Sequence, residues 1–117
     1  MDKDLKIRTK DFAVRIVRLF AALPKTTEAQ ILGKQILRCG TSVGAQYGES
    51  QYAKSDADFV SKIQGSLQEI EETLYWIELI EELRIFSPEK LDPIKREASE
   101  LRAILITIAK KVKSRTV

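Results

Sequence analysis

Basic side chains gather near both ends of the sequence. Segment 110–117 contains four cations and no carboxylate, and a second group lies within the first ten residues. These cations are Lys110, Lys111, Lys113 and Arg115, together with Lys6, Arg8 and Lys10. Clustered lysine and arginine side chains bind nucleic-acid phosphates by displacing condensed counterions. The alternative is that cations compensate the dipole at helix carboxyl ends and keep tails solvated.

Side chains that would support catalysis are few. The chain contains no histidine, which removes the usual general base and the Glu-x-x-His ligands of carboxylate-bridged metal bundles. Glu69 and Glu72 could gather an ion with Glu97 or Glu100, but carboxylates at helical spacing are far more often solvated. Cys39 lies in an apolar stripe and is expected to be a buried structural thiol. We therefore expect no enzyme activity, no cofactor, no metal site and no small-molecule substrate.

Apolar residues recur at spacings of three and four along four segments, the pattern of amphipathic helices. The predicted helices cover residues 9–23, 27–52, 56–84 and 88–113. Thr9 and Ser55 are expected to cap the first and third helices, and Ser87 before Pro88 marks the start of the fourth. Short connections make neighbouring helices antiparallel. The predicted fold class is all-α: one domain, residues 1–117, folded as an antiparallel up-down-up-down four-helix bundle.

Each predicted helix has one apolar face that should form the core. The expected core positions are Phe12, Ile16, Phe20, Leu23, Leu32, Ile36, Cys39, Val43, Tyr47, Phe59, Ile63, Ser66, Ile70, Leu74, Ile77, Leu91, Ile94, Ala98, Leu101, Leu105, Ile108 and Val112. A chain of 117 residues with 44% hydrophobic and 32% charged side chains has the usual composition of a soluble domain.

The amino terminus and the apolar runs bear on localisation. Residues 1–4 are polar and mixed in charge, unlike a secretory signal. The longest strongly apolar stretch, residues 104–109, is far shorter than the roughly 20 residues that span a bilayer. We expect a cytoplasmic protein with no membrane partner.

Four glycines lie on one side of the predicted helix 27–52. Gly33, Gly40, Gly44 and Gly48 are spaced by seven, four and four residues. Each costs about 1 kcal/mol relative to alanine in a helix interior, so their presence needs a reason. The favoured interpretation is a smooth groove against which another helix of the same bundle packs. A kink near residues 39–42, or a binding site that uses exposed backbone, are the alternatives.

A polar stripe follows the same helix. It consists of Gln35, Arg38, Ser42, Gln46 and Glu49. The stripe is either an ordinary solvated face or a polar surface used in function or between subunits.

The second half of the predicted helix 56–84 has an unusually wide apolar arc. Trp76, Leu79, Ile80 and Leu83 extend it to roughly 200°, against about 100° for a bundle helix buried on one side. The turn with Ile85 and Phe86 would cover part of this surface. Tryptophan is favoured at protein–protein contacts, so these four residues are the predicted interface of a homo-oligomer.

Topology brings the two basic segments together. In an up-down-up-down bundle the start of the first helix and the end of the fourth lie at the same end. That end is predicted to contact the phosphates of RNA or DNA, with Arg38 as a further contact. No aromatic residue interleaves the carboxyl-terminal cluster, so base stacking is not expected there.

A set of short motifs resembles a known family. The motif residues are Gln35–Arg38, Thr41–Ala45, Glu49, Ser55, Asp58–Phe59, Gly65–Glu69 and Glu72–Trp76. From Phe12 to Lys111 the chain resembles the bacterial four-helix bundle proteins often encoded in intervening sequences of 23S ribosomal RNA genes. Gln46 and Gly48 stand where that family commonly has asparagine and alanine.

The resemblance carries its own expectations. It implies a homo-oligomer, most simply a ring of five. The family is also similar to the accessory protein of diversity-generating retroelements, a basic pentameric bundle that binds nucleic acid and its reverse transcriptase. The leading hypothesis is therefore a non-enzymatic, homo-oligomeric bundle that binds structured RNA through its basic end. The alternative is a protein–protein scaffold that uses the apolar face of the third helix and the polar stripe of the second.

Overall fold

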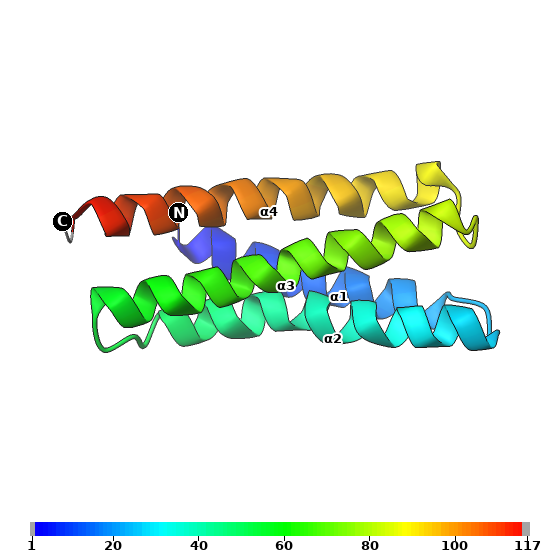
Figure 1. Ribbon diagram of the computed structural model, residues 1–117, viewed down its shortest axis with the longest axis horizontal. Helices are drawn as coiled ribbons and strands as arrows, with labels where there is room; N and C mark the ends of the chain where they lie inside the picture. Colours follow the sequence, from blue (N-terminus) through cyan, green and yellow to red (C-terminus); the bar gives the residue numbers. More distant parts are fainter. Residues whose placement is uncertain (1, 116–117) are drawn as a thin grey trace.

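Four helices account for most of the computed structural model, which describes residues 2–115, with side chains from residue 5. The helices are α1 (Asp2–Ala21), α2 (Thr27–Ser50), α3 (Asp56–Glu82) and α4 (Pro88–Arg115). They lie antiparallel in an elongated bundle measuring 49 × 22 × 21 Å (Figure 1). In sequence order each helix contacts the next, and α1 closes the bundle by contacting α4. The predicted all-α four-helix bundle is confirmed.

Local capping signals set three of the helix starts. Ser55 Oγ accepts a hydrogen bond from the amide of Asp58 at 3.0 Å, and Ser87 Oγ accepts one from Lys90 at 3.3 Å. Both of these starts were predicted. Thr26 accepts in the same way from Ala29 at 3.3 Å and caps α2. Such caps satisfy amides that have no partner inside the helix.

The prediction that Thr9 caps the first helix is wrong. The helix α1 begins at Asp2, so Thr9 lies inside it, only 2% exposed, and donates a hydrogen bond to the carbonyl of Lys6 at 3.2 Å. The physical reason is that the apolar stripe continues before Thr9: Leu5 is 3% exposed and joins the core. The other three predicted starts agree with the structure. The predicted ends each differ by two residues, since α1 ends at Ala21, α2 at Ser50, α3 at Glu82 and α4 at Arg115.

The core is built from the predicted apolar faces. Phe12, Ile36, Ile70 and Leu101, one from each helix, are buried to within 1% of full enclosure. Five expected core positions are only partly buried and pack around its edge: Phe20, Leu32, Phe59, Leu74 and Ile108. Among the described residues, none of the four helices is both long and apolar enough to cross a bilayer.

Three of the four helix-two glycines are explained by close contact with α1. A Cβ atom on Gly40 would lie 2.7–2.9 Å from three carbons of Ile16, and one on Gly44 would lie 3.1 Å from the hydroxyl of Thr9. Gly33 is crowded in the same way by Phe20 of α1 and by Leu23 just after it. The helix α2 runs through residues 39–42 without a break. The groove interpretation is therefore correct for these glycines, and the kink is not observed. A Cβ on Gly48 would meet no described atom within 4 Å.

This contrast predicts opposite effects of the same substitution. Gly48→Ala should raise the free energy of unfolding by up to about 1 kcal/mol, because alanine is the better helix former and the space is open. Gly40→Ala should lower it by about 1–2 kcal/mol, because overpacking against Ile16 outweighs that gain. Urea unfolding followed by circular dichroism measures both. Equal effects at the two positions would contradict the close packing of α1 on α2.

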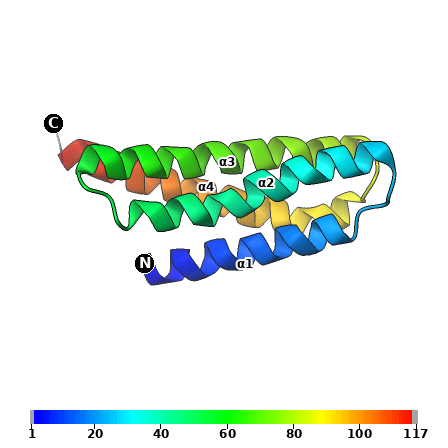
Figure 2. The same ribbon diagram turned by 90° about the horizontal axis from the view of Figure 1, so that it is seen from below.

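Both ends of the described chain lie at one end of the bundle. The start of α1 and the end of α4 are on the left in Figure 1, and the turned view in Figure 2 agrees. The turn between α2 and α3, residues 51–55, lies at the same end, whereas the other two turns lie at the opposite end.

Candidate nucleic-acid interface

The predicted meeting of the two basic segments is observed. One cleft at this end is lined by Leu5 and Arg8 of α1 and by Lys111 and Arg115 of α4. Lys54, from the turn before α3, lines it as well. Residues separated by about a hundred positions in the sequence therefore share one surface. Lys54 was not predicted, because it stands alone in the sequence between Ala53 and Ser55.

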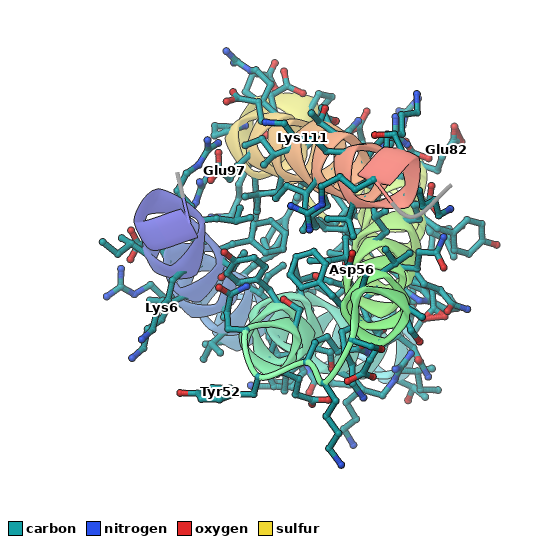
Figure 3. All side chains as sticks on the ribbon, turned by 90° about the vertical axis from the view of Figure 1, so that its left-hand side faces the viewer. Lys6, Tyr52, Asp56, Glu82, Glu97 and Lys111 are labelled. Carbon is teal, nitrogen blue, oxygen red and sulfur yellow. The ribbon has the colours of Figure 1, made fainter. Side chains whose placement is uncertain are left out.

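Most of the cations at this end are exposed. We call the following set the basic end: Lys6, Lys10, Lys54, Lys110, Lys111, Lys113 and Arg115. Figure 3 looks onto it and shows that Lys6 extends from the side of α1 away from α4, whereas Lys111 lies on α4. The cations therefore surround the end rather than form one flat patch.

Acidic neighbours reduce the charge at only part of the basic end. Arg115 Nη2 lies 3.5 Å from Asp56 Oδ1, at the start of α3. Lys113 has an interaction of its own. Lys6, Lys10, Lys54, Lys110 and Lys111 form no ion pair within 4.0 Å with another described residue. These five ammonium groups are available to anions without first breaking an ion pair.

Arg8 has a different role from the lysines around it. Its Nε and Nη2 donate to the two oxygens of Glu97 at 3.0 and 2.6 Å, and Nη2 also donates to Glu100 at 3.1 Å. Glu97 lies between α1 and α4 in Figure 3. The hydrogen bond to Glu97 raises the pKa of Arg8 above its ordinary value. Arg8 had been expected to contact phosphate. Because two carboxylates offset its charge, it joins α1 to α4 instead.

Arg38 does not lie at the basic end. It is twelve residues before Ser50, which places it roughly 18 Å along the axis of α2 from that end. Its Nη2 lies 3.2 Å from Glu72 Oε2 and its Nη1 lies 3.6 Å from Glu69 Oε1. The hydrogen bond to Glu72 raises the pKa of Arg38. Arg38 therefore belongs to a separate polar contact between α2 and α3.

The polar stripe of α2 largely faces α3. Gln46 Nε2 donates to Glu69 Oε2 at 3.3 Å, and Glu49 pairs with Lys62 at 3.5 Å. The Gln46 amide also packs directly against Gly65, where a Cβ would overlap it. Glu69 Oε1 is buried without a hydrogen bond to a described residue, and Nη1 of Arg38 lies 3.6 Å from it. Because of these contacts, the polar stripe serves mainly to join α2 to α3 rather than as a surface for a partner.

The wide apolar arc of α3 is smaller than the sequence indicated. Ile80 is 0% exposed because the helices of its own bundle cover it. Its assignment to an oligomer interface is therefore wrong. Trp76 and Leu79 are partly buried, and Leu83 is 54% exposed. Tyr75, which sequence analysis missed, is 57% exposed, and its ring centroid lies 5.0 Å from that of Trp76. We call Tyr75, Trp76, Leu79 and Leu83 the α3 apolar patch.

Side chains that could bind a metal do not gather in the part of the chain whose side chains are described. Within residues 5–115 no cluster of three or more Cys, Asp or Glu side chains has metal-binding geometry. Cys39 is fully buried, and its Sγ donates to the carbonyl of Gln35 at 2.8 Å. Burial raises the pKa of the Cys39 thiol, which disfavours the reactive thiolate.

The fold and this surface define the class of protein: a small all-α four-helix bundle with exposed cations gathered at one end. The family is more specific. The family model for the 23S rRNA-intervening sequence protein matches residues 2–107, and the chain belongs to that family. No curated protein matches the chain.

A solved structure agrees with this assignment. The chain is similar to a protein of unknown function from the S23 ribosomal protein family of Bacteroides thetaiotaomicron VPI-5482, whose crystal structure is known at 1.70 Å resolution. The two share 39% sequence identity, the match covers 91% of this chain and 98% of the other, and the TM-score is 0.86.

Proposed function

We propose that this protein is a non-enzymatic, homo-oligomeric bundle that binds nucleic acid, structured RNA in particular, through its basic end. The observation that carries the proposal is the convergence of α1, the α2–α3 turn and α4 on one end, where five lysines form no ion pair with another described residue. Unpaired ammonium groups are the chemistry that recognises phosphate. The family name refers to 23S rRNA, which is compatible with an RNA ligand.

Acidic residues elsewhere on the molecule support an oriented interaction. Glu78, Glu81 and Glu82 lie near the opposite end, where α3 finishes. Only Glu81 of these pairs with a described cation, Lys95 Nζ at 3.0 Å. The carboxylates of α3 offset cations at that end, so a polyanion is attracted more strongly to the basic end, which would favour one orientation of binding.

The direct experiment is fluorescence anisotropy of a labelled RNA hairpin titrated with the protein. A dissociation constant of about 10⁻⁶ M or tighter is expected at about 0.1 M salt, at the tight end of sequence-independent binding. An anisotropy that stays flat up to about 10⁻⁴ M protein would contradict the proposal.

Self-association through the α3 apolar patch is the second part of the proposal. Trp76→Ala should lower the mass measured by sedimentation, because the patch loses its largest aromatic side chain. A ring of five copies of 13.3 kDa would sediment at about 66 kDa. Tyr52→Ala is the matched control, since Tyr52 is 88% exposed and lies outside the patch. A wild-type protein that sediments as a monomer would rule out self-association.

The alternative function is a protein–protein scaffold, and the exposed Tyr75 and Leu83 favour it. Large apolar side chains on a surface mark contacts with other proteins. Affinity capture from lysate with and without nuclease separates the two functions. Partners lost after nuclease treatment support nucleic-acid binding, and partners that persist support the scaffold.

A further inference from the structure

A cleft of about 720 Å³ opens at the basic end of the bundle. It lies between the start of α1, the α2–α3 turn and the end of α4, the region that Figure 3 views from outside. Its volume falls within the range of about 300–1,000 Å³ that is common for ligand sites. The cleft exists because α1 contacts α4 less extensively than the other neighbouring helices contact each other.

The cleft has two kinds of wall. Its apolar wall consists of Leu5, Phe59, Ile104, Ile108 and Val112. Phe59, Ile104 and Ile108 are only partly buried, so their apolar surface remains accessible from the cleft. The polar rim carries the cations of Arg8, Lys54, Lys111 and Arg115 and the carboxylate of Asp56. No aromatic residue stands beside the carboxyl-terminal cations in the sequence, but folding brings Phe59 there from α3.

The charges on the rim are not equivalent. Arg8 is held by Glu97 and Glu100, and Arg115 lies 3.5 Å from Asp56. Lys54 and Lys111 form no ion pair with a described residue, and they come from different elements of the fold. A ligand that matches this site has a flat apolar body with an anionic group on each side.

We infer that the terminal cleft receives one unpaired nucleobase of the bound nucleic acid, with the base against Phe59 and its flanking phosphates at Lys54 and Lys111. This inference rests on the proposed function. Every base has an aromatic face that stacks on a phenyl ring, whatever its sequence. Bases inside a duplex have their faces covered by neighbours, so the ligand is a loop, bulge or single-stranded end.

The experiment compares three labelled RNA ligands of equal length and charge with the wild-type protein. They are a hairpin with an unpaired loop, the same hairpin with abasic loop nucleotides, and a fully paired duplex. Stacking of one base corresponds to roughly 5- to 150-fold in affinity, so the first hairpin should bind tighter than the other two by a factor in that range. Equal affinities for all three would overturn the inference while leaving the proposed function in place.

Two variants locate the base. Phe59→Leu keeps an apolar side chain in the wall but removes the aromatic face, so the preference for the intact loop should disappear. Tyr52→Ala is the control, because Tyr52 is exposed at the same end and projects away from the cleft in Figure 3. Loss of the preference with Tyr52→Ala and not with Phe59→Leu would place the base outside the cleft and overturn the inference.

Failure of the proposed function has a different signature. In that case none of the three RNA ligands binds, whatever the state of the loop. A melting curve of Phe59→Leu shows whether the variant is folded, and the comparison of ligands on the wild type tests the inference independently of that variant.

Discussion

Replacing Lys110, Lys111 and Lys113 with glutamine should weaken binding of an RNA hairpin by roughly 100- to 500-fold at about 0.1 M salt. The estimate follows from counterion release, in which each lost phosphate contact removes a factor of about 5 to 8 at that salt concentration. All three side chains are exposed on the last turns of α4, so their replacement leaves the core intact. Fluorescence anisotropy measures the change.

The matched control removes the same charge from the opposite end of the bundle. Lys25, Lys34 and Arg84 are exposed there, in or near the α1–α2 and α3–α4 turns. Replacing these three with glutamine should change the affinity by less than about threefold, because contacts beyond a Debye length are screened. If both triple variants weaken binding equally, only net charge matters and the basic end is not the binding surface.

The second large effect is expected on stability. Phe12→Ala should lower the free energy of unfolding by about 3–5 kcal/mol, the usual range for deleting a buried aromatic side chain. Phe12 is 0% exposed and lies on the face of α1 that enters the core. Docking of α1 on the core holds Lys6 and Lys10 at the basic end, so this packing also supports that surface. Chemical denaturation in urea measures the loss.

Val14→Ala provides the control for that substitution. Val14 is on the same helix but 42% exposed, and its replacement should cost less than about 0.5 kcal/mol. A cost below about 1 kcal/mol for Phe12→Ala would indicate that α1 is not firmly packed in solution. The basic end would then lack the geometry on which binding depends.

The fold could be predicted because its signals are local. Serine caps at Ser55 and Ser87 need only the next few residues, and the apolar stripes need only helical periodicity. The start of α1 was missed because Thr9 has the chemistry of a cap, yet Leu5 continues the stripe and buries that turn. Here tertiary packing decided between two locally acceptable starts.

The candidate site could be predicted only in part. Topology alone places the start of α1 beside the end of α4, and the structure agrees. The pairing of Arg8 with Glu97 spans 89 positions in the sequence and has no local signal. The same applies to Phe59 and Lys54 in the cleft and to the enclosure of Ile80, which depend on how far the helices are rotated about their axes.

The most direct test of binding at the basic end is the salt dependence of the dissociation constant for the RNA hairpin. For the wild-type protein the logarithm of the affinity should fall linearly with the logarithm of salt concentration, and the slope should become shallower by about 2 to 3 in the Lys110, Lys111 and Lys113 triple variant. A wild-type affinity that does not change with salt, or an identical slope in the variant, would contradict binding of RNA at the basic end.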